Sequence, residues 1–442
     1  MTDIAPSTRD AALIADALKI RYSPMTAVRG EGSTLFDAEG RAWLDFGAGW
    51  AVASLGYSHP RVVQAIQEQV AKTTFAGLIS GLNEPALDLA QRLVDLMPGD
   101  FAKKVWFGHS GSDASEAAHR LVLAASGRKR VISFIGSWHG MTDSGQTLSG
   151  HPAFAAHPGG GHVTKLPYPN PARNPFGGAP EETLDQLFAY LEGYLFATIC
   201  PPGDVAAIFV ESVQSDGGDL VPPDEFLPRL RDLCDRHGIW LVVDDVKVGL
   251  GRTGHFFSYE QAGIAADLVI LGKALGGGLP LSALVGRREI LDAGTGTALF
   301  TTVGSATCCA AGLATVSAIV DEGLVGAATE RGASLQRALR EAFAGVPEVA
   351  DVRGRGLIQG VELVTAAGEP NQPLAAATVY RAWELGLILY YAGNWSNVLE
   401  LTPPLILTED EVARGVGILA QALDDAIHGR VDAATVAEFA GW

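Results

Sequence analysis

The stretch Leu268-Val-Ile-Leu-Gly-Lys273-Ala-Leu-Gly-Gly-Gly-Leu-Pro-Leu281 joins a short apolar strand to a lysine and then to three consecutive glycines. A lysine at the end of a buried strand is costly unless it has a partner or forms a covalent imine. Taken alone, Lys273 is more simply explained as a lysine in a surface loop. Other parts of the chain change that interpretation.

A second apolar strand, Ile239-Trp-Leu-Val-Val243, ends in Asp244-Asp245. Lys273 and Asp244 together supply an amine that can bind an aldehyde and a carboxylate that can keep a ring nitrogen protonated. Pyridoxal 5′-phosphate (PLP) requires both groups. The two strand ends therefore predict a PLP site.

The composition limits the classes of function. At 442 residues the chain is long enough for a large core and about two domains. Its 48% hydrophobic and 19% charged residues predict a compact globular protein, and the formal charge of −18 argues against nucleic-acid or anionic-membrane partners. The start, Met1-Thr-Asp-Ile-Ala-Pro6, does not resemble a signal peptide, and no apolar run predicts a membrane span. The four cysteines lack zinc-ligand spacing, so we expect a cytoplasmic protein without a metal site.

Short apolar strands alternate with helical stretches from about residue 60 to 325. This alternation predicts an α/β fold with a mainly parallel sheet covered by helices on both faces. The strands are expected at 105–107, 131–134, 207–210, 239–243 and 268–271, and an N-terminal helix at 12–20. We divide the chain into an N-terminal segment (1–60), a large domain (61–325) and a small C-terminal domain (326–442).

A candidate phosphate site follows the first of these strands, in Val105-Trp-Phe-Gly-His-Ser110-Gly111-Ser112. A helix that starts there offers free backbone N–H groups and the positive end of its dipole, and the hydroxyls of Ser110 and Ser112 add donors. A phosphate would fit on Gly111 and Ser112. The alternative is an ordinary helix start with Ser112 as the capping residue.

Trp138-His139-Gly140 follows the next strand. Trp138 could stack on a planar pyridine ring, although a tryptophan is more often a core residue. The stretch Gly249-Leu-Gly-Arg-Thr-Gly254 matches a dinucleotide-binding pattern, but no helical periodicity follows it. We therefore reject a dinucleotide site.

The stretch Asp244-Asp-Val-Lys-Val-Gly-Leu-Gly-Arg-Thr-Gly254, together with Gly272-Lys273, Ser110-Gly-Ser112 and Trp138-His-Gly140, resembles the class III aminotransferases of PLP fold type I. The resemblance covers nearly the whole chain. It implies a mainly parallel seven-stranded sheet in the large domain and an α+β small domain.

The same resemblance implies roles for individual residues. Lys273 would be the Schiff-base lysine and Asp244 the partner of the ring nitrogen, with His139 beside the cofactor. Val246 would pack on the ring face opposite Trp138. Thr301, or Thr302 if the register slips by one, would reach the phosphate bound by a neighbouring subunit, which implies a homodimer.

Within this family the chain resembles in particular α-amino-ε-caprolactam racemase and the related amino-acid amide racemases. The segments that carry this likeness are Trp106-Phe-Gly-His-Ser-Gly-Ser-Asp-Ala114, Gln214-Ser-Asp-Gly-Gly218, Asp245-Val-Lys-Val-Gly-Leu250, Leu399-Glu-Leu-Thr-Pro-Pro-Leu405 and Glu438-Phe-Ala-Gly-Trp442.

Two positions depart from ordinary aminotransferases. Lys247 stands where most relatives carry an uncharged residue, and a cation there would stabilise the cofactor's phenolate. Glu400 stands where many relatives have an arginine that pairs with the substrate carboxylate. Two like charges about 4 Å apart repel by about 4 kcal/mol at an effective dielectric near 20. We therefore expect a substrate without a free α-carboxylate, unless Glu400 points to solvent and another residue binds the carboxylate.

These residues predict a racemase or epimerase that inverts the α-carbon of amino-acid amides, lactams or neutral amino acids. Lys273 would be one general base, and Asp216, assisted by Lys247, would carry the proton on the opposite face. Trp50 and Trp138 would form walls of the substrate pocket, although Trp50 could simply be a packing residue. The alternatives are a class III aminotransferase that uses a keto acid and a catalytically silent cofactor-binding scaffold.

Overall fold

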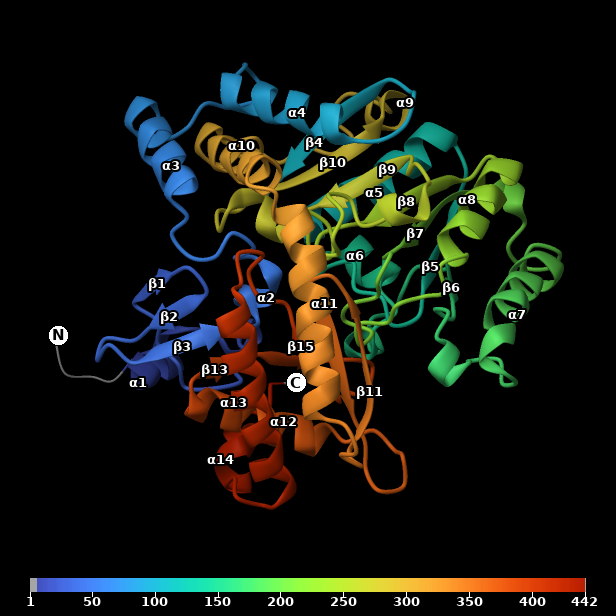
Figure 1. Ribbon diagram of the computed structural model, residues 1–442. Coiled ribbons are helices and arrows are strands. Elements are labelled where there is room, and N and C mark those ends of the chain that lie inside the picture. Colours follow the sequence, from blue (N-terminus) through green and yellow to red (C-terminus); the bar gives the residue numbers. More distant parts are fainter. Residues whose placement is uncertain (1–5, 442) are drawn as a thin grey trace.

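The computed structural model describes residues 6–441. Its largest sheet has seven strands and lies in the upper part of the molecule in Figure 1. The strand order is β4-β10-β9-β8-β7-β5-β6. β10 runs antiparallel to both its neighbours, and the other pairs are parallel. The strands are β4 (Lys103–Gly108), β5 (Arg130–Phe134), β6 (Val163–Leu166), β7 (Val205–Val210), β8 (Trp240–Asp244), β9 (Leu268–Leu271) and β10 (Ser282–Arg287). The expected mainly parallel α/β sheet is confirmed.

The central strands are apolar on both faces, which is why they appear as continuous hydrophobic runs. In β8, Leu241 and Val243 pack into one buried cluster while Val242 packs into another. Successive side chains of a strand point to opposite faces, so both clusters receive apolar groups from the same strand.

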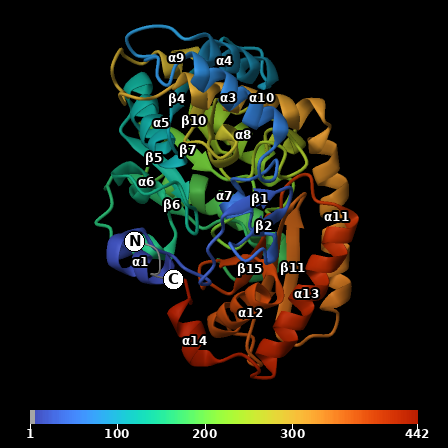
Figure 2. The same cartoon turned by 90° about the vertical axis from the view of Figure 1, so that its left-hand side faces the viewer.

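Helices cover both faces of this sheet (Figures 1 and 2). α5 lies on one face with Ala117 and Leu121, and α8 lies on the other with Leu230 and Leu233. The helices of this part are α3 (Pro60–Lys72), α4 (Glu84–Leu96), α5 (Gly111–Ser126), α6 (Asp143–Leu148), α7 (Thr183–Tyr190), α8 (Phe226–His237), α9 (Arg288–Leu291) and α10 (Ala306–Asp321).

A second layered unit is formed by the C-terminal part, where the sheet β11-β12-β15-β14 is antiparallel throughout. The long helix α11 connects it to the large sheet (Figure 1). Its elements are α11 (Leu324–Ala342), β11 (Val349–Arg355), β12 (Ile358–Leu363), α12 (Gln372–Leu385), β13 (Leu387–Ile388), β14 (Tyr390–Ala392), β15 (Val398–Leu401), α13 (Glu409–Ile427) and α14 (Ala433–Glu438).

The N-terminal part adds a small sheet of order β1-β2-β3-β13, in which the last strand comes from the C-terminal part and runs parallel to β3. Its elements are α1 (Pro6–Leu13), β1 (Arg29–Glu31), β2 (Thr34–Phe36), β3 (Ala42–Asp45) and α2 (Ala48–Ala51). This pairing joins the N-terminal part of the chain to the C-terminal part. The division into domains at residues 60 and 325 stays a prediction.

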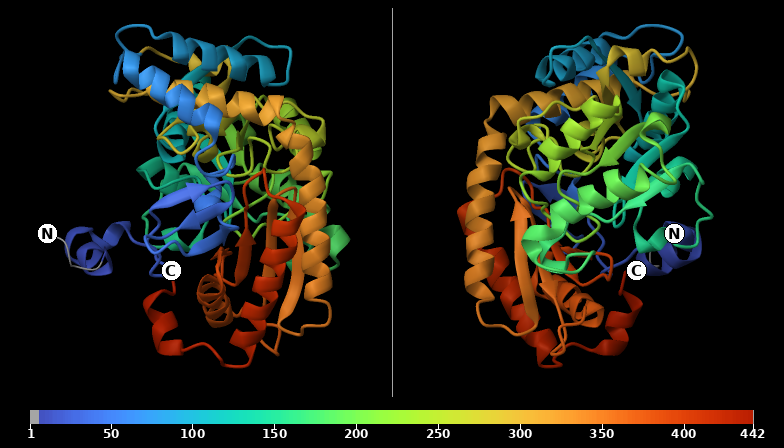
Figure 3. Two further views of the ribbon diagram at one scale, coloured as in Figure 1. Left: turned by 60° about the vertical axis from the view of Figure 1, so that its left-hand side comes forward. Right: turned by 90° about the vertical axis from the view of Figure 1, so that its right-hand side faces the viewer.

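The N-terminal helix expected at 12–20 was placed wrongly. α1 ends at Leu13, and only a single 3₁₀ turn, Asp16–Leu18, follows it. Leu13 and Leu18 are 73% and 78% exposed, so the apolar residues of this stretch have no core to pack on in this chain. Figure 3 shows α1 projecting from the body of the molecule. Without tertiary contacts, a short helix gains too little to extend.

Strands β6 and β10 were not predicted individually from the sequence.

The glycine-rich stretch 249–254 is a buried loop. The Arg252 side chain donates to the carbonyl oxygens of Leu357 and Pro403 and to Ser54 Oγ, so the loop connects parts of the chain that are distant in sequence. Within residues 6–441 no single helix could cross a membrane by length and composition; only α10 and α11 pass together, with a 65° bend between them. Residues 1–5 and Trp442, quoted above, lie outside the described residues.

Candidate active site

A pocket opens at the carboxyl ends of the central strands, where loops after β4, β5, β7, β8 and β9 meet. Ligands of open α/β sheets bind at this edge. The residues that line it are Gly111, Ser112, Ser115, Trp138, His139, Gly140, Glu211, Asp216, Asp244, Val246, Lys247, Val248 and Lys273. Most of the residues selected from the sequence therefore come together in one place.

Lys273 follows β9 with only Gly272 between them. Its φ of 44° lies in the left-handed region, which costs a non-glycine residue about 1–3 kcal/mol and persists where the surroundings enforce it. Burial, together with the nearby Lys247 ammonium, lowers the pKa of Lys273 below its ordinary value. A lowered pKa favours the neutral amine, which is the nucleophilic form.

Asp244, the last residue of β8, is 4% exposed and has a defined partner. His139 Nδ1 donates to Asp244 Oδ2 over 2.7 Å, and the backbone N–H of Val246 donates to Oδ1 over 3.0 Å. The backbone N–H of His139 donates in turn to Ser149 Oγ over 2.7 Å. These contacts hold the carboxylate in one orientation at the pocket wall, as an ion-pair partner for a ring nitrogen requires.

The phosphate end of the pocket lies at the N-terminus of α5. Ser110, and not Ser112, is the capping residue: its hydroxyl accepts from the backbone N–H of Asp113 in a capping box. Ser110 does not line the pocket, so its predicted contact with the cofactor has no geometric support in this chain. Ser112 lines the pocket and accepts from the backbone N–H of Met141.

Ser115 was missed by the sequence analysis. It lines the pocket one turn further along α5, and its buried hydroxyl has no hydrogen-bond partner among the described residues. Its spacing of three from Ser112 is the only sequence signal that could have found it, because residues three apart share a helix face.

Gly111 is required by close packing. A Cβ at this position would lie 2.8 Å from Val246 Cγ1, so no side chain fits between the helix start and the pocket wall. Backbone N–H groups at a helix N-terminus that lacks side chains can approach an anion directly. Together with Lys273 and Asp244, these groups fit the phosphate, aldehyde and ring nitrogen of PLP.

Glu211 also lines the pocket, and burial, followed by the charge of Asp244, raises its pKa well above the ordinary value.

Lys247 and Glu400 form a buried ion pair. Lys247 Nζ lies 2.6 Å from Glu400 Oε1 and 3.7 Å from Asp216 Oδ2, and Ser215 Oγ donates to the same Glu400 oxygen. Glu400 is fully buried, which rules out the alternative that it points to solvent. The expectation of a bare, repelling carboxylate was also wrong, because the ammonium of Lys247 neutralises it.

The carboxylates around Lys247 decide its charge. Burial alone would lower the pKa of Lys247, but Asp216 and Glu400 outweigh it and raise that pKa above its ordinary value. Burial would raise the pKa of Asp216, but the ammonium groups of Lys247 and Lys273 lower it. Both side chains are therefore charged at neutral pH.

The two tryptophans have different surroundings. Trp138 lines the pocket and packs on Phe154, with ring centroids 4.6 Å apart. Trp50 does not line it: its ring stacks on Tyr390 at 4.4 Å, with Lys247 Nζ 5.1 Å from its centroid. The opposite placement of Val246 and Trp138 across a ring stays a prediction, although both line the pocket.

Thr301 and Thr302 lie outside this pocket. Thr301 is exposed, and Thr302 Oγ1 lies 2.7 Å from His109 Nε2. The single chain neither supports nor opposes a contact from Thr301 to a neighbouring subunit's phosphate, so this role and the homodimer stay predictions.

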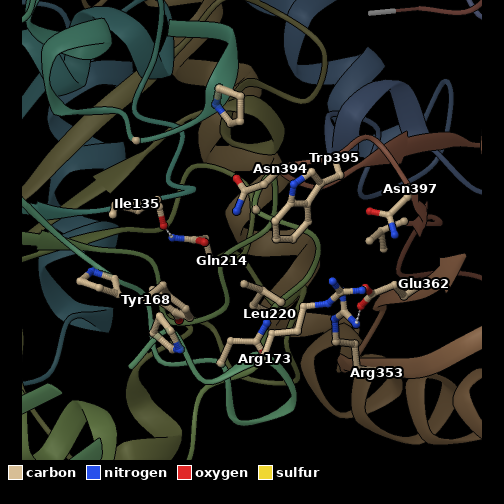
Figure 4. A pocket seen from close by; sticks show the side chains of 18 residues that line it. Ile135, Tyr168, Arg173, Gln214, Leu220, Arg353, Glu362, Asn394, Trp395 and Asn397 are labelled. Carbon is tan, nitrogen blue, oxygen red and sulfur yellow. Dashed lines mark hydrogen bonds and ion pairs between the residues drawn. The ribbon is translucent and has the colours of Figure 1, made fainter. Parts of the chain in front are cut away.

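A larger cavity of about 520 Å³ lies beside the 214–220 loop (Figure 4). Gln214, Gly217 and Leu220 line it, whereas Asp216 of the same loop lines the first pocket. In Figure 4, Arg353 and Glu362 reach it from the C-terminal part. It holds neither Lys273 nor Asp244, so the smaller pocket is the candidate active site.

The fold and the site together define a PLP-dependent enzyme of fold type I. The chain belongs to the class III aminotransferase family: the family model described as Aminotransferase class-III matches residues 18–423. PLP is accordingly its cofactor.

The relatives include both racemases and aminotransferases. The chain is 36% identical over 434 residues to an alanine/serine racemase of Pyrococcus horikoshii, covering 96% of this chain and 91% of that protein. It is 38% identical over 411 residues to a 5-aminovalerate aminotransferase of Pseudomonas aeruginosa, covering 91% and 94%. The crystal structure of an ω-transaminase from Pseudomonas jessenii in complex with PMP matches with a TM-score of 0.85 and 29% identity, over 92% of this chain and 93% of that one.

Proposed function

We propose that this protein is a PLP-dependent racemase or epimerase that inverts the α-carbon of neutral amino acids or their amides and lactams. The observation that carries the proposal is a further ionisable carboxyl group in the pocket, which could serve as a second proton carrier. Asp216 lines it together with Lys273, in addition to the carboxylate of Asp244 that suits the ring nitrogen. Inversion needs proton transfer on two faces of the α-carbon, whereas transamination returns the proton elsewhere.

PLP, when bound, withdraws electrons from the α-carbon of an attached amino substrate and makes its C–H bond acidic. Lys273 Nζ would take or return the α-proton on one face. The Asp216 carboxylate would do so on the other face, with Lys247 Nζ 3.7 Å away to stabilise its charge. Asp244 would hold the ring nitrogen protonated.

The pairing of Glu400 widens the substrate class beyond amides. Because Lys247 lies 2.6 Å from Glu400, the repulsion of a substrate carboxylate by Glu400 is largely cancelled. Glu400 therefore does not by itself exclude free neutral amino acids as substrates. The relationship to an alanine/serine racemase supports the same class.

Proton exchange tests the proposed function. The holoenzyme is incubated in deuterated water with one enantiomer of alanine, and in parallel of α-amino-ε-caprolactam, without any keto acid. We expect deuterium at the α-carbon and loss of optical rotation at similar rates. Exchange without loss of rotation, or no exchange of either compound, would contradict a racemase.

Asp216→Asn is expected to reduce α-proton exchange more for one enantiomer than for the other, by about 10²-fold or more, because a general base typically contributes this factor. The exchange rates of both enantiomers are measured by NMR. Asp224→Asn, which changes an exposed carboxylate, serves as the matched control. Equal losses for both enantiomers would remove Asp216 from the proton transfer.

The second candidate is a class III aminotransferase, favoured by the 38% identity to the 5-aminovalerate aminotransferase. It predicts that the amino form of the cofactor accumulates with the donor and is discharged by a keto acid. An absorbance change that appears with the donor alone and is reversed by the keto acid, without loss of optical rotation of the remaining donor, would favour it over racemisation.

A further inference from the structure

Asp219 occupies a strained position in the loop that carries Asp216. Its φ of 52° lies in the left-handed region, and its backbone N–H donates to the carbonyl oxygen of Ser215 over 2.9 Å. Two guanidinium nitrogens of Arg353 donate to the carbonyl oxygen of Gly218, at 2.9 and 2.6 Å. The loop is thus clamped from the C-terminal part by Arg353, which lines the adjacent cavity in Figure 4.

The Asp219 side chain is fully buried, and neither carboxyl oxygen accepts a hydrogen bond from the described residues. A buried carboxylate without donors is among the costliest groups a protein can hold. A neutral carboxylic acid costs far less and can itself donate. The surroundings of the Asp219 carboxyl group therefore favour its protonated form over the carboxylate.

The position of Asp219 indicates which group would accept a hydrogen bond from its protonated carboxyl group. A Cβ on Gly360 would lie 3.0 Å from Asp219 Oδ2, so the Asp219 carboxyl occupies the place of a side chain at position 360. Gly360 on β12 is the direct cross-strand partner of Glu400 on β15. Cross-strand partners project from the same face as neighbours. Asp219 thus lies beside Glu400, whose buried Oε2 also has no hydrogen-bond partner.

We propose that Asp219 is a protonated carboxylic acid that donates its hydrogen to Glu400 and so acts as a positioning residue for Lys247 and Asp216. The hydrogen bond would hold Glu400 in place as the partner of Lys247. Of the three carboxyl groups Asp216, Asp219 and Glu400, Asp216 is the one that lines the active-site pocket. The part of this inference that concerns Asp216 rests on the proposed function.

The electrostatic surroundings agree with a protonated Asp219. Burial, followed by the negative charge of Glu400, raises the pKa of Asp219 well above its ordinary value. Lys247 and Arg353 act in the opposite direction, and Asp216 adds a smaller raising effect. These effects together favour the neutral form of the carboxyl group.

Infrared spectroscopy of the holoenzyme tests the protonation directly, whatever reaction the enzyme catalyses. In the difference spectrum between the unaltered protein and Asp219→Asn at pH 7, we expect loss of one carbonyl-stretch band of a protonated carboxyl group. The exposed Asp224→Asn should remove none. Asparagine tolerates a left-handed φ, so the variant should fold. An unchanged protonated-carboxyl region would overturn the proposal.

The pH dependence of α-proton exchange tests the positioning role. Glycine also tolerates the left-handed φ but removes the donor. Without that donor the charged form of the cluster made by Lys247, Glu400 and Asp216 loses a stabilising hydrogen bond, so Asp219→Gly should move the acid limb of the exchange profile up by about one pH unit, a tenfold loss at a fixed pH on that limb. Asp219→Asn, whose amide N–H can donate to Glu400, should largely restore the profile. An unchanged pH profile in Asp219→Gly would overturn the positioning role. If the unaltered protein shows the infrared band but no α-proton exchange, the proposed function is refuted while the protonation of Asp219 is established.

Discussion

Replacement of Lys273 by alanine is expected to abolish α-proton exchange, with a loss of about 10⁴-fold or more, because one side chain supplies both the amine that binds the cofactor and one general base. Burial and the Lys247 ammonium lower the pKa of Lys273, so its amine is prepared for both tasks. Exchange is measured by NMR. Borohydride treatment of the unaltered holoenzyme should in addition attach the cofactor irreversibly to residue 273.

Lys104→Ala, which removes an exposed lysine paired with Asp292, is the matched control and should exchange normally. Cofactor attached by borohydride to a peptide other than the one with Lys273 would refute the assignment. So would a Lys273→Ala protein that retained the exchange rate of the unaltered enzyme.

Asp244→Asn should lower the exchange rate by about 10³-fold. Removing one partner of a buried, hydrogen-bonded charge pair costs about 3–5 kcal/mol, and each 1.36 kcal/mol in the barrier is a factor of ten. The amide cannot hold a ring nitrogen protonated, so the α-carbon loses its strongest electron sink. The exchange rate and the visible absorbance of the bound cofactor are both measured, since the variant should still bind PLP through Lys273.

Asp245→Asn is the appropriate control because it changes the adjacent buried carboxyl. Asp245 does not line the pocket and accepts from the backbone N–H of Ser258 over 2.9 Å. Burial raises the pKa of Asp245 to about 7, so its neutral isostere is a mild change. Equal losses in the two variants would mean that Asp244 acts only through stability.

Much of the fold could be predicted from local patterns. The strands around Val242 and Ile270 are apolar on both faces, and this property alone identifies central parallel strands. β6 (Val163–Leu166) was missed because Thr164 and Lys165 interrupt its apolar residues. β10 (Ser282–Arg287) was missed because it follows the glycine- and proline-rich stretch 276–280 and contains Gly286 itself. The antiparallel insertion of β10 between β4 and β9 depends on the path of the chain, which no local pattern records.

The sequence by itself determined the residues at the strand ends, Lys273 and Asp244, because reactive side chains directly after apolar strands fall at one edge of a parallel sheet. Only the tertiary structure decided which charges meet. Glu400 is paired with Lys247, 153 residues away, and Asp219 lies in the gap that Gly360 leaves beside Glu400. The charge and hydrogen-bonding state of a carboxyl group depend on its burial and its nearest donors, and both come from distant segments brought together by folding.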